Sequence, residues 1–181
     1  MKKAKIYIPT KTAMQSGNGK TKTWLLKFQT KDLQSKNKEI ISKYNSPFSS
    51  NGGIKVLKGN LGTSVIKTSA VDKKKWYVKA EAIVIQDQNK LNELFKSGEL
   101  NKDFVLVVSN QGPKSNGMPE LHQLTPILSI LQHQGYSVAL ITDGRMSGAS
   151  GKIPAAIHLS PEAVDQGPIS KIKNGDIIEL D

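Results

Sequence analysis

Two apolar runs dominate the second half of the chain, DFVLVVSN at residues 103–110 and YSVALITDG at residues 136–144. Apolar side chains on both faces of a short run are typical of a strand buried between two layers. Between them, residues 118–135 have apolar positions at helical spacing and end at Gly135, a common helix terminator. This order predicts two parallel strands joined by a crossover helix.

Shorter elements precede and follow this unit. Residues 89–100 predict a short helix with Leu91, Leu94 and Phe95 on one face and Gly98 at its end. The other predicted features, in chain order, are β-like pieces in residues 54–71 interrupted by Gly59 and Gly62, a strand around 82–85, a loop over 145–156, and a hairpin-like turn at 174–176. Together they predict an α/β fold with a barrel-like mix of strands.

The first third of the chain has a different pattern. Residues 4–10 and 22–30 predict two short strands around a glycine-rich turn, and residues 32–45 form a polar, potentially helical connector. Residues 1–58 contain 13 lysines and 2 acidic residues, whereas residues 59–181 contain 13 basic and 13 acidic residues. The whole net charge of +11 therefore lies in the first third, which indicates two segments of different origin or a basic arm.

A basic arm can bind nucleic acid, but this one is poorly suited to it. It contains no arginine, the residue that most often reads base edges, and its aromatic residues are too scattered for a stacking platform. Nucleic acid is therefore an improbable partner, and a solubilising lysine-rich segment explains the composition more simply.

Composition excludes several other classes. Without cysteine, the chain cannot supply a disulfide, a thiolate zinc site or the thiolates of an iron–sulfur cluster. No apolar run approaches the roughly 20 residues of a membrane span, and the start lacks the apolar core of a secretory signal, so we expect a cytoplasmic protein. The three histidines, His122, His133 and His158, lack the spacing of a metal site.

Two glycine-rich loops follow the two buried strands, at residues 111–120 and 143–152. In open α/β sheets, ligands gather beyond the carboxyl ends of the strands, so these loops are the candidate site. Glu120 follows Pro119 and fits the first turn of a helix, where an acid interacts well with the helix dipole. A ligand role for Glu120 is the alternative, which the neighbouring Gly112 and Gly117 favour by allowing close backbone approach.

The second loop, TDGRMSGASGK, resembles a phosphate-binding loop but fails the Walker pattern, because Met146 and Ile153 stand where that pattern needs glycine and a hydroxyl residue. The hydroxyls of Ser147 and Ser150 beside Arg145 and Lys152 could still hold an anion. A plain surface turn explains the same composition.

These loops also carry a family resemblance. The segments GNLGTSVIKTSAV, NQGPKSNGMPELHQLTPIL, ITDGRMSGASGKIPAAIHLSPEA and KNGDIIEL resemble the C-terminal part of the dihydroxy-acid/phosphogluconate dehydratase family, in its 6-phosphogluconate version. The resemblance extends from about residue 32 to residue 181. It implies a swivelling β/β/α domain that closes over a larger N-terminal domain. In the family, that larger domain carries a 4Fe–4S or 2Fe–2S cluster and most ligands of a divalent metal such as Mg²⁺.

The resemblance also implies roles for individual residues. Glu120 would be the metal ligand that the C-terminal domain supplies, and Ser147 would be the base that takes the proton next to the substrate carboxylate. The family reaction converts 6-phospho-D-gluconate to 2-dehydro-3-deoxy-6-phosphogluconate. From their place in the same loop, we interpret Asp143, Arg145 and Lys152 as contacts to the anionic substrate.

The resemblance implies no cofactor-binding residues in this chain, because the cluster domain and its cysteines are absent from the sequence. We therefore expect the isolated chain to be inactive as a lyase. Its expected partners are a separate cluster-bearing dehydratase domain, the sugar-acid phosphate and, through the exposed closure face, a second copy of itself in a homo-oligomer.

Residues 1–31 resemble the start of the complex I accessory subunit family, the electron-transport-chain conserved region. The segment AKIYIPTKTAMQSGNGKTKTWLLKF carries that pattern. We interpret the chain as a fusion with three parts: this β fragment at 1–31, a connector at 32–53, and the dehydratase C-terminal domain at 54–181. The alternatives are a non-catalytic fusion remnant and an accessory module that docks on a respiratory complex.

Overall fold

The computed structural model of the chain describes residues 35–43, 45–147 and 152–181. The chain divides into two compact units, 1–48 and 49–181. The two strands predicted before residue 31 lie outside the described residues, and the domain boundaries predicted at residues 31 and 53 stay predictions.

The connector does not form the helix that its sequence permits. Residues 35–43 and 45–48 adopt turns and bends. Their side chains bond to nearby backbone instead: the Asn37 carbonyl oxygen accepts a hydrogen bond from the Ser35 hydroxyl at 2.7 Å, and the Asn37 side chain accepts one from the Glu39 amide at 2.9 Å. Such local bonds compete with helical ones, and Ile40 and Ile41 are exposed, so no packing interaction favours a helix here.

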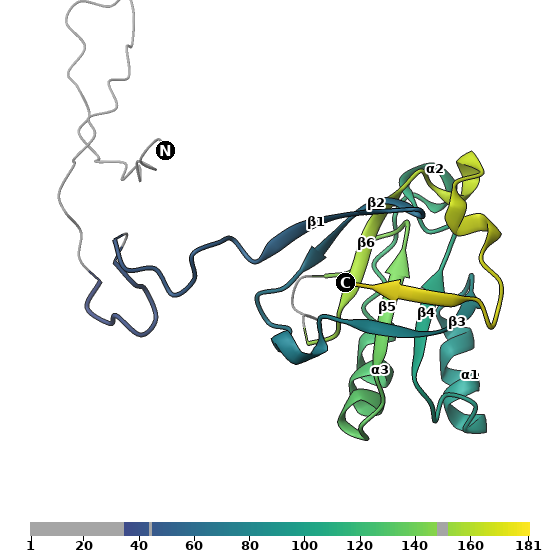
Figure 1. Cartoon of the computed structure of the whole chain (residues 1–181), viewed down its shortest axis with the longest axis horizontal. Coiled ribbons are helices and arrows are strands. Elements are labelled where there is room, and N and C mark those ends of the chain that lie inside the picture. The colour runs from purple at the N-terminus through teal and green to yellow at the C-terminus, as the bar shows by residue number, and fades with distance from the viewer. Residues whose placement is uncertain (1–34, 44, 148–151) are drawn as a thin grey trace, which may run out of the picture. The chain divides into compact units, whose positions relative to one another are not determined.

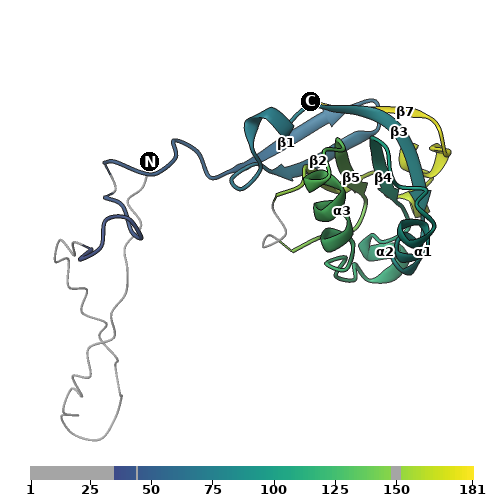
Figure 2. The same cartoon turned by 90° about the horizontal axis from the view of Figure 1, so that it is seen from below.

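Residues 49–181 form one seven-stranded sheet in the order β1-β2-β6-β5-β4-β3-β7 (Figure 1). The strands are β1 Ile54–Gly59, β2 Gly62–Lys67, β3 Val78–Ile85, β4 Phe104–Val108, β5 Val138–Thr142, β6 Ala155–Ser160 and β7 Ile177–Leu180. The four central strands, β3 to β6, pair in parallel, and the outer pairs are antiparallel. Figure 2 shows the sheet curled into a half-barrel, which confirms the α/β class.

The parallel centre of the sheet is buried on both faces, as its sequence predicts. All five residues of β4 and all five of β5 are buried. Phe104, Leu106 and Leu140 belong to the core cluster under the helices, whereas Val105 and Ile141 belong to the cluster on the opposite face. The alternation follows from the period-two geometry of a strand, so two continuous apolar runs stabilise two hydrophobic layers.

Two helices, α1 Asn89–Ser97 and α3 Leu124–His133, cover the same face of the sheet. The end of α1 is as predicted, because Gly98 adopts the left-handed conformation of a C-terminal cap. The described residues also contain the short helices η1 Lys73–Lys75, α2 Pro113–Asn116, η3 Ala163–Asp165 and η4 Pro168–Lys171. No helix in the described part of the chain is long and apolar enough to cross a membrane.

The start of α3 corrects one prediction. The helix begins at Leu124 rather than near residue 118, so Glu120 does not lie in its first turn. Met118 has a φ of 58°, which is incompatible with a helix, and Glu120 forms a parallel bridge with Arg145. A pairing partner distant in sequence therefore outweighs the local helix-start signal.

Two further predictions fail for the same reason. The loop predicted over residues 145–156 ends earlier, since β6 begins at Ala155 and pairs with β5 and β2. The turn at 174–176 is not a hairpin, because β7 pairs with β3 from the middle of the chain. Its backbone instead bonds to that strand: the Gly175 amide donates to the Ala82 carbonyl at 3.0 Å.

The turn between β1 and β2 provides a stability test. Gly62 has a φ of 124°, and a Cβ atom there would collide with the Ser160 carbonyl oxygen. We expect Gly62→Ala to lower the free energy of unfolding by about 1–3 kcal/mol, because strain and a backbone clash add. Urea unfolding measures this, with Gly59→Ala as the matched control, since a Cβ at Gly59 meets nothing within 4 Å. Equal losses in the two variants would contradict the steric argument.

Candidate functional site

The candidate site lies where β4 and β5 end side by side, since Val108 is paired with Thr142 in the parallel register. The chain leaves β4 into residues 109–123 and leaves β5 into residues 143–154. Both loops therefore start from the same edge of the sheet, as the sequence predicts from the strand–helix–strand order.

Asp143 connects the two loops below the surface. Asp143 is only 1% exposed. The carboxylate accepts hydrogen bonds from the backbone amides of Asn110 at 3.1 Å, Gln111 at 2.9 Å and Ala163 at 3.0 Å. Three bonds to backbone amides satisfy a buried carboxylate well, so its observed contacts hold loops together. Its predicted contact with substrate stays a prediction.

Gln111 and Glu162 also support the first loop, and sequence reasoning did not single them out. The Gln111 amide nitrogen donates to the Gln86 carbonyl at 2.7 Å, and its amide oxygen accepts from Asn116 at 3.0 Å. The Glu162 carboxylate accepts from the Lys114 amide at 3.1 Å. Gly112 is the sequence feature that could have pointed to Glu162. A side chain at position 112 would collide with the Glu162 carboxylate, so a glycine is favoured there.

Glu120, Arg145 and Ser147 come together in the same two loops. The Arg145 guanidinium donates to the Glu120 carboxylate at 2.8 Å and to the Met118 carbonyl at 3.0 Å. The other Glu120 oxygen accepts from the Ser147 backbone amide at 2.6 Å. Two residues predicted for different roles, Arg145 and Ser147, are thus bonded to the same carboxylate.

This cluster is open to solvent rather than buried. The side chain of Glu120 is 26% exposed and that of Arg145 is 47% exposed. An ion pair of this kind contributes at most about 1 kcal/mol to stability, so its role is to orient groups more than to hold the fold. An ionised carboxylate has about four acceptor positions, and Arg145 and Ser147 use two of them. Glu120 therefore retains the capacity to bind a further cation.

The chain does not form a complete metal centre by itself in its described part. No group of three or more His, Cys, Asp or Glu side chains gathers there at metal-binding distances. Glu120 fits as one carboxylate ligand, and the remaining ligands would have to come from elsewhere. A cysteine-ligated cluster does not fit this chain, because its sequence contains no thiolate donor.

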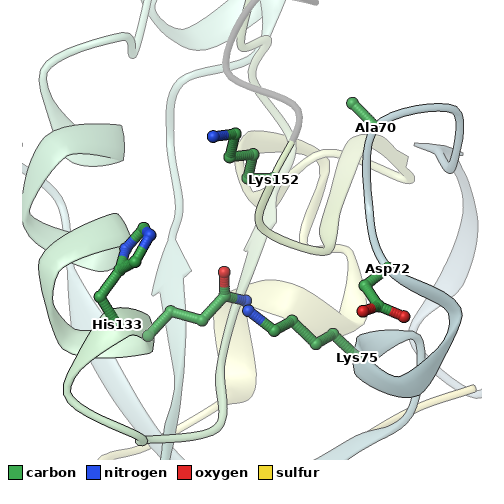
Figure 3. A pocket seen from close by; sticks show the side chains of 6 residues that line it. Ala70, Asp72, Lys75, His133 and Lys152 are labelled. Atoms are coloured by element: carbon green, nitrogen blue, oxygen red, sulfur yellow. The ribbon is translucent and has the colours of Figure 1, made fainter.

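Lys152 lies in different surroundings. It lines a shallow concavity beside the C-terminal turn of α3, together with Lys75 and His133 (Figure 3). Glu120, Arg145 and Ser147 are not among the residues that line it. Of the five residues proposed from the sequence, three are thus adjacent, Asp143 is buried and bonds to the backbone of the first loop, and Lys152 belongs to a second surface. Ser150 lies outside the described residues.

The sequence that forms this fold and these loops matches a family of dehydratase C-terminal domains. The sequence model of the dihydroxy-acid/6-phosphogluconate dehydratase C-terminal family matches residues 39–181. The chain therefore belongs to this family.

Within the family, the phosphogluconate branch is the more similar. The chain is 60% identical to the phosphogluconate dehydratase of Helicobacter pylori strain 26695 over 145 residues. The aligned residues are 80% of this chain and 24% of that protein. The phosphogluconate dehydratase of Escherichia coli K12 is 50% identical over 141 residues, 78% of this chain and 23% of that protein. The dihydroxy-acid dehydratase of Methanobrevibacter smithii is 37% identical over 154 residues, 83% of this chain and 28% of that protein.

The similarity is thus to the C-terminal domain of phosphogluconate dehydratases, which confirms the branch predicted from the loop motifs. The chain spans about a quarter of the length of these relatives. The comparisons do not favour the alternatives of a fusion remnant or a respiratory accessory module. The resemblance of residues 1–31 to the complex I accessory family and the cytoplasmic location stay predictions.

Proposed function

We propose that this chain supplies the closing domain of a 6-phosphogluconate dehydratase site, whose other half comes from a cysteine-bearing dehydratase domain. One observation carries the proposal. Glu120 and Ser147, the two residues that the family resemblance implies in the chemistry, are joined by a 2.6 Å hydrogen bond at the carboxyl edge of the parallel strands.

In the proposed reaction, Ser147 acts as its alkoxide, whose oxygen accepts the proton from C2 of the substrate, next to its carboxylate. The hydroxyl on C3 departs as hydroxide and takes that proton back from the Ser147 hydroxyl, so that one molecule of water is lost and the alkoxide is restored. The resulting enol tautomerises to the 2-keto acid. A bound divalent cation and an iron–sulfur cluster would supply Lewis-acid polarisation of the departing hydroxyl. Glu120 would hold the cation as one of several ligands.

The other residues of the loops have positioning tasks in this proposal. Arg145 holds the Glu120 carboxylate, and through the Ser147 amide the same carboxylate holds the backbone that carries the catalytic hydroxyl. Asp143 fixes the start of the first loop to the second. Positioning of this kind matters because a small displacement of a reacting group costs a large part of the rate.

Complementation tests this function. The purified chain is mixed with the Helicobacter pylori phosphogluconate dehydratase shortened by the C-terminal quarter that this chain matches. We expect no formation of 2-keto acid from 6-phosphogluconate by either component alone and measurable formation by the mixture. Full-length enzyme serves as the positive control. A mixture that forms a stable complex by size-exclusion chromatography and still lacks activity would contradict the proposal.

A further inference from the structure

A second surface of the domain gathers cationic groups. A shallow concavity separates the β2–β3 connection from the C-terminal turn of α3 (Figure 3). Side chains from three segments that are distant in sequence converge on it. The lining residues are Ala70, Asp72, Lys75, Gln132, His133 and Lys152.

The two lysines are available for an anion. Within the described residues, neither Lys75 nor Lys152 takes part in an ion pair. Arg145, the other cation of the second loop, is already bonded to Glu120 and to the Met118 carbonyl. Lys152 is therefore the cation of that loop which remains free to receive a charged part of a substrate.

His133 and Gln132 add polar side chains to the same surface. The His133 Nδ1 lies 2.6 Å from the Ser129 carbonyl oxygen, which can only accept, so Nδ1 carries a proton. The ring lies at the C-terminal end of α3. The Gln132 side-chain amide provides a neutral donor beside it.

Asp72 lowers the net positive charge of the concavity and holds the segment that carries Lys75 in place. Its Oδ1 accepts from the Lys74 amide at 3.1 Å, and its carbonyl accepts from the Lys75 amide at 2.8 Å. These bonds fix the single turn of η1 and with it the position of Lys75. Because the Asp72 carboxylate is negative, a doubly charged anion needs both lysines to bind.

We propose that this concavity binds the phosphate group of a phosphorylated sugar acid, an inference that rests on the proposed function. The Thr125 hydroxyl donates to the Met146 sulfur, so the start of α3 adjoins the Ser147 segment. His133 lies eight residues further along the helix, about 12 Å away. An extended six-carbon sugar acid together with the reach of a lysine side chain spans such a distance. Its carboxylate end then faces Ser147 while its phosphate end faces Lys75 and Lys152.

The binding test uses the isolated, ¹⁵N-labelled chain in NMR titrations with three probes: inorganic phosphate, 6-phosphogluconate and unphosphorylated gluconate. We expect the first two to shift the amide signals of Lys75, Gln132, His133 and Lys152, because the phosphate group makes the contacts. Gluconate is expected to leave these signals unchanged. Absence of shifts with inorganic phosphate, or shifts with inorganic phosphate but not with 6-phosphogluconate, would overturn the proposal.

Variants separate a built site from general charge attraction. Lys75→Gln and Lys152→Gln should each weaken phosphate binding about tenfold, the effect of losing one charge-assisted hydrogen bond. Lys96→Gln on α1 removes the same charge from outside the concavity and should change affinity less than twofold. Asp72→Asn keeps a side chain that can accept from Lys74 and should tighten binding. Equal weakening by all three lysine variants would mean charge attraction only and would overturn the site.

The outcome is independent of the dehydration assay. Phosphate binding with the expected variant pattern, in a chain that fails to complement, would count against the proposed reaction and not against the anion site. A complemented enzyme with normal KM for 6-phosphogluconate in Lys75→Gln and Lys152→Gln would refute the anion site and leave the proposed reaction intact.

Discussion

Replacing Ser147 by alanine is expected to reduce kcat of the complemented dehydratase by about 10²- to 10⁴-fold, the usual contribution of a positioned acid–base group. Only the hydroxyl is lost in this variant. The Ser147 backbone amide, which donates to Glu120 at 2.6 Å, remains in place, so the loop should keep its conformation. The measurement is formation of the 2-keto acid under saturating 6-phosphogluconate, with complex formation checked by size-exclusion chromatography.

Ser97→Ala is the matched control for this prediction. Ser97 ends α1 and its hydroxyl donates to the Leu94 carbonyl, away from both loops. We expect turnover of that variant to stay within about twofold of the unmodified mixture, since a surface substitution there touches no reacting group. Turnover of Ser147→Ala at the same level as Ser97→Ala would show that Ser147 is not the base, while complementation itself would still stand.

Replacing Asp143 by alanine is expected to lower the free energy of unfolding by about 3–4 kcal/mol. The variant leaves the amides of Asn110, Gln111 and Ala163 without their carboxylate acceptor in a largely buried place, and each unsatisfied buried donor costs roughly 1–3 kcal/mol. Urea unfolding of the isolated chain gives the stability. Hydrogen exchange of the Gln111 and Ala163 amides should accelerate in the same variant.

Asp87→Ala provides the comparison, because Asp87 also accepts a backbone amide, that of Asn89 at 2.9 Å, but at an exposed helix start. Water can replace that acceptor, so we expect a loss of only about 1 kcal/mol. A similar small loss in Asp143→Ala would mean that the two loops hold together without the buried carboxylate. In that case its predicted contact with substrate becomes the better explanation for Asp143.

Much of the fold could be predicted from the sequence because the signals are local. The continuous apolar runs that became β4 and β5 can only be stable between two layers, and Gly98 and Gly135 mark helix ends through their backbone freedom. The same argument gave the site its location, since a strand–helix–strand order brings two loops to one sheet edge.

Apart from the connector, whose local side-chain bonds prevent a helix, the errors have a common cause in pairing between distant segments. Glu120 had a good local signal for a helix start, yet its bridge to Arg145 decides its conformation. The strand β6 follows a glycine-rich loop that hid its beginning, and β7 pairs with β3 rather than with a neighbour in sequence. Local propensities differ by a fraction of a kcal/mol per residue, so sheet pairing and burial readily outweigh them.

The sequence by itself determined the family and the α/β class, and it predicted which residues of the two loops carry chemistry, because these inferences depend on residue types in a fixed order. Only the tertiary structure decided which of those residues meet. Glu120 and Ser147 share a hydrogen bond, Asp143 is buried, and Lys152 lines a concavity with Lys75 and His133 instead. The reason is physical: a side chain's neighbours are set by how strands curl and pair across the sheet, and that geometry is a property of the whole packed chain.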